Sequence, residues 1–198
     1  MNENGGIKMW YFLDCVTGHK SHSKEVMAEL DCKNPALYDF FIHNQDSNIL
    51  DHINLKAKGQ KDLKREMMAT VDYLQLLSFP TPVFSKRFFD KLGNSLSGSL
   101  SFHPCEVYLE TGESYEFYLG RILNRLPVVD KEKSGYRVLT DGTKILDEPY
   151  IIKEEADETL LIVRDLELAT PIVSGVFKNM VEANKLKIGF DDVSNSFW

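Results

Sequence analysis

The phrase TPVFSKRF occupies residues 81–88, and the chain writes a close copy of it, TPIVSGVF, at residues 170–177. Both copies place Thr-Pro before two apolar residues, then Ser, two variable positions and Phe. Proline disfavours helix in the residue before it. A serine hydroxyl can accept hydrogen bonds from the free N–H groups of a first helical turn. Each copy therefore predicts an extended segment that runs into a short helix capped by Ser85 or Ser174.

The residues after each serine continue the same pattern. Phe88 and Phe177 fall in the first turn, and Leu92 and Val181 follow each serine by seven positions, on the same helix face. Turn-forming residues then end each helix. An apolar-alternating segment comes next, LSF in the first copy and LKIGF in the second. The sequence thus predicts a pseudo-repeated unit of extended segment, capped helix and return strand.

The middle of the chain is typical of β-hairpins. Residues 105–119, CEVYLETGESYEFYL, predict one hairpin with Thr-Gly at its tip. Residues 136–146, YRVLTDGTKIL, predict a second, because Asp-Gly is a favoured pair for a tight turn. The segments YIIK and TLLIV flank EEADE, residues 154–158, and predict a third hairpin with an acidic loop.

The N-terminal third gives weaker patterns. Residues 7–14 are aromatic and β-branched enough for a strand. Residues 23–30, SKEVMAEL, favour a short helix with Ser23 as its N-cap. Apolar residues at helical spacing favour a helix over about 60–70, followed by an extended stretch.

Together these patterns predict an α+β fold, with a largely antiparallel β-sheet of hairpins and a few short helices packed on one of its faces. We expect residues 1–198 to form a single domain. In it, residues 1–70 are the less well defined N-terminal part, and residues 72–192 hold the repeat and the hairpins.

The net charge of −7 lies entirely in the second half of the chain. Residues 1–99 carry twelve basic and twelve acidic side chains, whereas residues 100–198 carry eleven basic and eighteen acidic ones. An acidic half argues against binding nucleic acid and suits a basic protein partner, although it also serves solubility. No apolar run approaches a membrane span, no signal peptide opens the chain, and three cysteines are too few for a disulfide framework. We therefore expect a cytoplasmic protein with no membrane partner.

The order of these segments resembles a known family. An apolar-Ser helix start, a β-rich middle containing YEFYLGRILNRLPVVD (115–130), and a second apolar-Ser helix before LKIGF resemble bacterial polymorphic-toxin immunity proteins over residues 72–192. The resemblance implies a cytoplasmic protein that binds a cognate secreted toxin and neutralises it. We expect the mechanism to be stoichiometric occlusion, in which the bound protein covers the toxin's active site or its substrate path. The resemblance implies no catalytic residues and no cofactor, and it assigns no residue to toxin binding.

Two features of the sequence could contact such a toxin. The acidic run Glu154, Glu155, Asp157 and Glu158 could form charge-assisted hydrogen bonds with a basic partner, although a solvated turn has the same composition. Trp198, in an aromatic tail, could anchor a partner or pack on the body.

A structural zinc site is one alternative. It would use four side chains of ligand type near the N-terminus, Cys15, His19, His22 and Cys32. Their spacing is not that of a common zinc finger, and a core cysteine with loop histidines explains them more simply.

Two further classes of protein stay open. His103 and Cys105 would share a face of a strand, where they could form an activated nucleophile. A metal- or thiol-dependent enzyme would use this pair or the zinc set. A structural or adaptor protein without a toxin partner would use neither.

Overall fold

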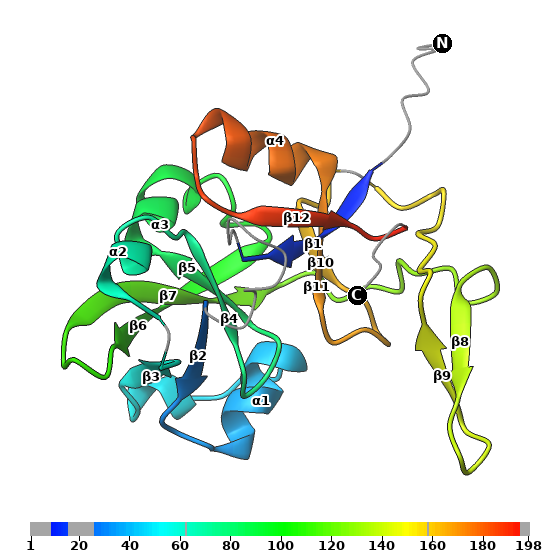
Figure 1. Ribbon diagram of the computed structural model, residues 1–198. Helices are drawn as coiled ribbons and strands as arrows, with labels where there is room; N and C mark the ends of the chain where they lie inside the picture. The colour runs from blue at the N-terminus through cyan, green and yellow to red at the C-terminus, as the bar shows by residue number, and fades with distance from the viewer. Residues whose placement is uncertain (1–8, 16–25, 62, 158, 195–198) are drawn as a thin grey trace.

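The largest element of the fold is a closed barrel of six strands (Figure 1). The computed structural model describes residues 9–15, 26–61, 63–157 and 159–194. The barrel strands follow the order β2-β3-β6-β7-β5-β4. The pairs β2–β4 and β3–β6 are parallel, and the other four neighbouring pairs are antiparallel. The bounds are Met27–Leu30 (β2), Leu55–Gly59 (β3), Tyr73–Leu76 (β4), Pro82–Ser85 (β5), Leu100–Tyr108 (β6) and Ser114–Ile122 (β7).

A four-stranded antiparallel sheet lies beside the barrel, in the order β10-β11-β1-β12. The first strand, β1, therefore pairs with two strands from the other end of the chain. Both faces of this sheet are buried: Tyr11 and Leu13 belong to the main core, while Trp10 and Phe12 belong to a second, smaller core. The bounds are Trp10–Asp14 (β1), Ile162–Arg164 (β10), Pro171–Ser174 (β11) and Gly189–Asp192 (β12).

The repeated phrase folds as its pattern predicts. In each copy a strand, β5 or β11, runs directly into a helix, which is α3 (Lys86–Leu92) or α4 (Gly175–Ala183). The Oγ of Ser85 accepts a hydrogen bond from the N–H of Phe88 at 3.1 Å, and the Oγ of Ser174 accepts one from Phe177 at 3.4 Å. The rings of Phe88 and Phe177 lie 6.2 Å apart, centroid to centroid, so the two units meet inside the core.

The predicted hairpins are confirmed in two cases out of three. The strands β6 and β7 form the first, and β8 (Gly135–Val138) and β9 (Lys144–Asp147) form the second. Gly112 and Gly142 in their turns have φ values of 87° and 85°, which an L side chain rarely adopts. The third prediction is wrong. The segment before EEADE bridges Val129 through Ile152, and β10 after it pairs with β11 instead.

The predicted sheet needs correction too. The α+β class is right, but the strands close into a mixed barrel with a separate sheet beside it, because β2 and β3 pair with distant strands in parallel. The helices do not share one face: α1 (Pro35–Ile42) and α3 contact the barrel, whereas α4 contacts β11. In Figure 1, α1 lies below the barrel and α3 above it.

The predictions for the N-terminal third are confirmed for some segments and wrong for one. The strand expected over 7–14 is β1, and the helix and extended stretch expected near 60–76 are α2 (Arg65–Met68) and β4. The helix predicted over 23–30 is wrong for its described part. Met27–Leu30 is a strand in which buried Ala28 and Leu30 alternate with partly exposed residues, and pairing on both sides overrides helix propensity. Ser23 lies outside the described residues.

The remaining helical segments are short. Asn34, whose side chain accepts from the N–H of Ala36, caps α1, and η2 (Ile49–Asp51) is a single 3₁₀ turn. Among the described residues, no helix has both the length and the apolar character needed to cross a membrane.

The two caps should differ in their contribution to stability. The Oγ of Ser85 also donates to the carboxylate of Asp72 at 2.5 Å, in addition to capping α3. We therefore expect Ser85→Ala to lower the free energy of unfolding by about 2 kcal/mol, and Ser174→Ala by about 1 kcal/mol. Urea denaturation followed by circular dichroism measures both, with each variant as the control for the other. Equal losses would show that the bond to Asp72 contributes no net stability.

Candidate functional site

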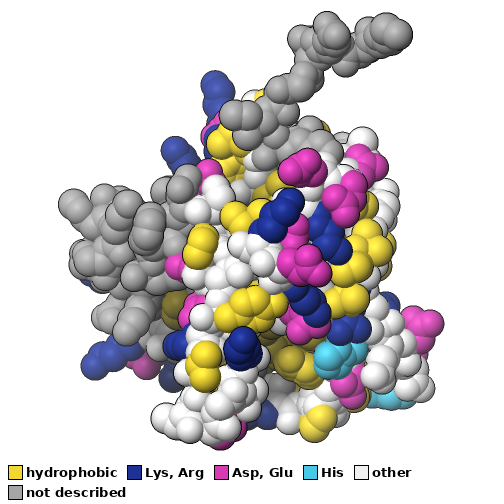
Figure 2. Space-filling view, turned by 90° about the vertical axis from the view of Figure 1, so that its right-hand side faces the viewer, with side chains coloured by type: hydrophobic (Ala, Val, Ile, Leu, Met, Phe, Trp, Pro, Cys, Tyr) yellow, Lys and Arg dark blue, Asp and Glu magenta, His cyan; other side chains and the backbone are white. Residues whose placement is uncertain are grey.

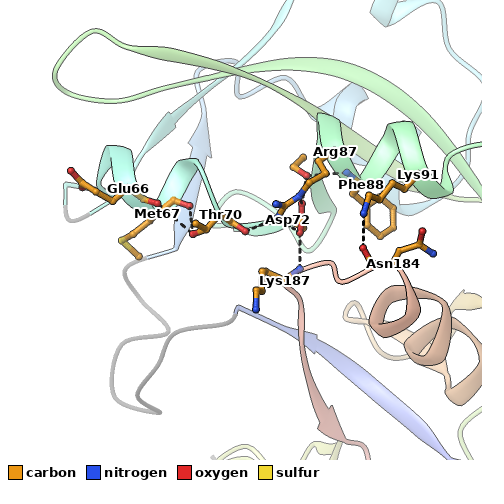
Figure 3. Close-up of polar contacts among 10 residues, drawn as sticks. Glu66, Met67, Thr70, Asp72, Arg87, Phe88, Lys91, Asn184 and Lys187 are labelled. Carbon is orange, nitrogen blue, oxygen red and sulfur yellow. Dashed lines mark hydrogen bonds and ion pairs between the residues drawn. The ribbon is translucent and has the colours of Figure 1, made fainter.

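A cluster of polar groups surrounds Asp72, whose carboxylate is fully buried (Figure 3). One carboxylate oxygen accepts from Ser85 Oγ at 2.5 Å and from Arg87 Nε at 2.9 Å. The other accepts from Arg87 Nη2 at 2.5 Å and from the backbone N–H of Lys187 at 2.6 Å. Arg87 Nη2 also donates to the carbonyl of Thr70 at 2.8 Å. Because four donors already surround Asp72, we interpret the cluster as a structural junction between α3 and the segment before β12.

A surface pocket of about 670 Å³ lies over β3, β6 and β7. Lys56 and Glu106 form an ion pair across its wall, with 2.8 Å between Nζ and Oε2. This pairing raises the pKa of Lys56 and lowers the pKa of Glu106. Glu116 lies directly opposite Glu106 on the neighbouring strand and accepts a hydrogen bond from the hydroxyl of Tyr118 at 2.5 Å. Lys56, Glu106 and Glu116 of this pocket thus each have a partner within the protein.

His103 and Cys105 also line this pocket, but their protonation is the reverse of what an activated thiol needs. Burial raises the pKa of the Cys105 thiol to about 12. Burial, with a contribution from Arg121, lowers the pKa of His103 to about 4. A thiolate–imidazolium pair requires a lowered thiol pKa and a histidine that can hold a proton. The Cys105 Sγ instead lies 3.9 Å from the carbonyl of Glu106, and His103 Nε2 lies 3.0 Å from Ser101 Oγ.

The structure describes only half of the predicted zinc set. Cys15 is buried, donates through Sγ to the carbonyl of Val26 at 3.4 Å, and has a pKa raised to about 12 by burial. Cys32 is partly buried, while His19 and His22 lie outside the described residues. Among the described residues, no three His, Cys, Asp or Glu side chains form a group suited to a metal ion. Zinc binding by the four side chains therefore stays a prediction.

The acidic run is an exposed turn fixed by a buried residue at its centre. Glu154, Glu155 and Asp157 are exposed, whereas Ala156 is buried in the second core against the four-stranded sheet. The Oδ1 of Asp157 accepts from the N–H of Thr159 at 2.9 Å, and Glu154 lies 3.8 Å from Lys133 Nζ. The carboxylates are therefore presented by a positioned turn. Glu158 and Trp198, the other two predicted contact residues, lie outside the described residues.

The hairpin of β8 and β9 lies next to this turn and was not predicted to be part of the site. Three of its residues, Tyr136, Val138 and Leu139, expose large apolar side chains. Figure 2 views the molecule from the side on which this hairpin lies in Figure 1, and shows hydrophobic side chains interspersed with acidic and basic ones. The sequence identified the hairpin but not its exposure, because alternation within one strand does not show which face is covered.

A comparison with protein-family models shows which family the chain belongs to. A model described as "Immunity protein family (Imm11)" matches residues 49–195. The chain belongs to this family. The predicted resemblance to immunity proteins is therefore confirmed, and the match begins earlier than residue 72. No curated protein matched the chain.

Membership in an immunity protein family implies a toxin as partner in general terms. The matched region contains the pocket, the acidic turn and the β8–β9 hairpin, as well as both copies of the repeated phrase. It leaves out β1, although β1 lies between β11 and β12 in the sheet. The residues before the match therefore complete the structure that the matched region builds.

The thiol alternative makes a direct chemical prediction. Since the pKa of Cys105 is raised to about 12, little thiolate is present at pH 8. We expect iodoacetamide to modify Cys105 in the native protein at least about a hundredfold more slowly than in urea-unfolded protein. Peptide mass spectrometry of timed samples measures the rates, and the unfolded chain is the control. A native rate close to that of a free thiol would revive the thiol enzyme.

Proposed function

We propose that this protein is a non-enzymatic immunity protein that acts in the cytoplasm against a secreted toxin of interbacterial competition. It binds the cognate toxin one to one and covers the toxin's active site or the path of its substrate. Such an interface typically buries about 1,600 Å² in total. The observation that carries the proposal is the family match over residues 49–195.

The chemistry of the described side chains supports binding over catalysis. The one Cys–His pair raised by the sequence has its pKa values displaced away from an activated nucleophile. In the polar cluster around Asp72, the carboxylate oxygens already accept hydrogen bonds from neighbouring residues. In the pocket wall, Lys56 and Glu106 are already paired with each other. The acidic second half of the chain suits a toxin with a basic surface, because complementary charge speeds association.

The predicted contact residues remain part of this proposal. Glu154, Glu155, Asp157 and Glu158 form an acidic edge that meets the basic surface of the toxin, and Trp198 adds an aromatic contact. Support comes from the first three, which are exposed on a turn held in place by buried Ala156. Neither nucleic acid nor membrane is part of the proposed mechanism.

The central test is neutralisation with a measured stoichiometry. We expect co-expression to rescue growth of cells that produce the C-terminal domain of the adjacent gene's product, and the two proteins to co-purify. In vitro, residual toxin activity should fall linearly with added protein and reach zero at one equivalent, because occlusion consumes one binder for each toxin. Cells with an empty vector are the control. Neutralisation by a small fraction of an equivalent would indicate an enzyme, and absence of both rescue and complex would favour an adaptor.

The acidic turn should act mainly on the rate of association. We expect Glu155→Gln combined with Asp157→Asn to lower the association rate constant roughly threefold at low salt. The difference should disappear near ~0.5 M salt, because exposed charges are then screened. The dissociation rate should change less than about twofold. Stopped-flow fluorescence with the purified toxin domain measures both rates.

The matched control is Asp51→Asn combined with Glu66→Gln, which removes the same charge from exposed residues elsewhere. If both double variants slow association equally, net charge of the whole molecule is responsible. The acidic turn would then have no special part in the encounter.

A further inference from the structure

The β8–β9 hairpin forms a two-stranded sheet of its own, separate from the barrel and from the four-stranded sheet. Among the described strands, β8 and β9 pair only with each other. Figure 1 shows the hairpin projecting from the lower right of the body, with its turn farthest out. With four residues in each strand, the ribbon extends about 15 Å. Two-stranded ribbons are marginally stable alone in water, so a free one needs support from elsewhere.

That support comes from the base of the hairpin. The N–H of Gly135 donates to the carbonyl of Pro149 at 2.9 Å. The hydroxyl of Ser134 accepts from the N–H of Ile151 at 2.9 Å and donates to the carbonyl of Asp130 at 2.7 Å. Leu146, on β9, packs against the second core. The ribbon is thus fixed where it leaves the body, and this fixes the direction in which it projects.

Large apolar side chains are exposed along the ribbon, among exposed charged ones such as Arg137, Asp141 and Lys144. Tyr136 is 47% exposed, Val138 is 60% exposed and Leu139 is 40% exposed. Tyr136 and Val138 are two residues apart on β8, so their side chains lie on the same face. Apolar side chains clustered on a projecting element mark an interaction surface more often than isolated ones do.

Charge is distributed around the hairpin in the manner of an interface. Residues 135–147 carry two basic and two acidic side chains and are neutral. The described flanking residues 130–134 and 148–157 carry six acidic and three basic side chains. A hairpin of zero net charge that exposes large apolar side chains beside an acidic surround resembles the apolar centre and polar rim of many protein–protein interfaces. Its complement is a concave apolar site with a basic rim.

We propose that the β8–β9 hairpin enters a cleft on the toxin, and that the acidic residues around its base meet a basic rim of that cleft. The proposal rests on the proposed function and names the surface that performs it. A narrow convex element fits a concave site, and substrate clefts are the concave sites of enzymes. A basic rim is typical of clefts that attract polyanionic substrates, so the toxin acts on a substrate of that kind. The hairpin then occupies the place of the substrate.

The test replaces one exposed valine with glutamate on the hairpin and another elsewhere. Val138→Glu replaces the most exposed of the hairpin's large apolar side chains with a charged one, and we expect it to raise the dissociation constant for the purified toxin domain roughly thirtyfold. Val176→Glu, at a residue of α4 that is 44% exposed, is the matched control and should change affinity less than about twofold. In Figure 1, α4 lies at the top of the molecule, far from the hairpin. Isothermal titration calorimetry measures affinity, and thermal unfolding checks that both variants fold.

A second measurement needs no variant. Amide hydrogen exchange of the wild-type complex should slow in residues 135–147, because the ribbon is covered when the toxin binds. The loss of affinity in Val138→Glu should appear in the dissociation rate, whereas the acidic turn affects association.

Each outcome decides between the proposals. If the wild type binds the toxin, but Val138→Glu binds equally tightly and exchange in 135–147 is unchanged, the hairpin proposal is overturned and the proposed function stands. If the wild type does not bind the toxin, both fall together. A dimer of the free protein that Val138→Glu dissociates, seen by sedimentation velocity, would assign the hairpin to self-association and also overturn the proposal.

Discussion

The buried carboxylate of Asp72 is the interaction on which the arrangement of barrel and sheet depends. A buried charge is costly unless its oxygens are hydrogen-bonded, and here the donors come from two separate parts of the chain, residues 85–87 and Lys187. Ser85 and Arg87 bring the first repeat unit to Asp72, and the N–H of Lys187 brings the end of the second. Removing any one of these donors leaves a buried carboxylate oxygen with one partner in place of two, so the carboxylate favours the conformation in which both units are in place.

The packing that starts at this junction continues to the acidic turn and the β8–β9 hairpin. Close contact between the two units lets Phe88 and Phe177 share one core, and β11 enters the sheet beside β1. The opposite face of that sheet carries Trp10 and Phe12, which pack with Ala156 and Leu146. The contact of Ala156 holds the acidic turn in place, and the contact of Leu146 holds the hairpin. The exposed acidic turn and hairpin are therefore positioned by the second core, to which Ala156 and Leu146 connect them.

Local sequence patterns predicted the structural features that depend on interactions between residues close together in the chain. Serine caps, Asp-Gly turns and proline boundaries act within a few residues, so both capped helices and two hairpins could be read from the sequence. Barrel closure could not, because the parallel pairs β2–β4 and β3–β6 join segments whose registers are set by tertiary packing. The strand at Met27–Leu30 was missed for the same reason.

The candidate site likewise has one part that local sequence predicts and one part that depends on tertiary packing. Charge at residues 154–158 is visible in composition, and its described members are exposed as a solvated turn should be. The apolar face of the β8–β9 hairpin is not visible in the same way, since Tyr136 and Val138 would suit a buried strand equally well. Only the packing of the whole chain shows that nothing described covers them.

The position of β1 has a consequence for the timing of folding. This strand is synthesised before its sheet partners β11 and β12, which lie more than 150 residues farther along the chain. Such pairing gives a high contact order, which slows folding. The sheet cannot close while a ribosome still holds β12, so a half-synthesised chain has no platform beneath the acidic turn and the hairpin. The acidic turn and the hairpin therefore gain their support only after β12 has left the ribosome, some 175 residues after β1.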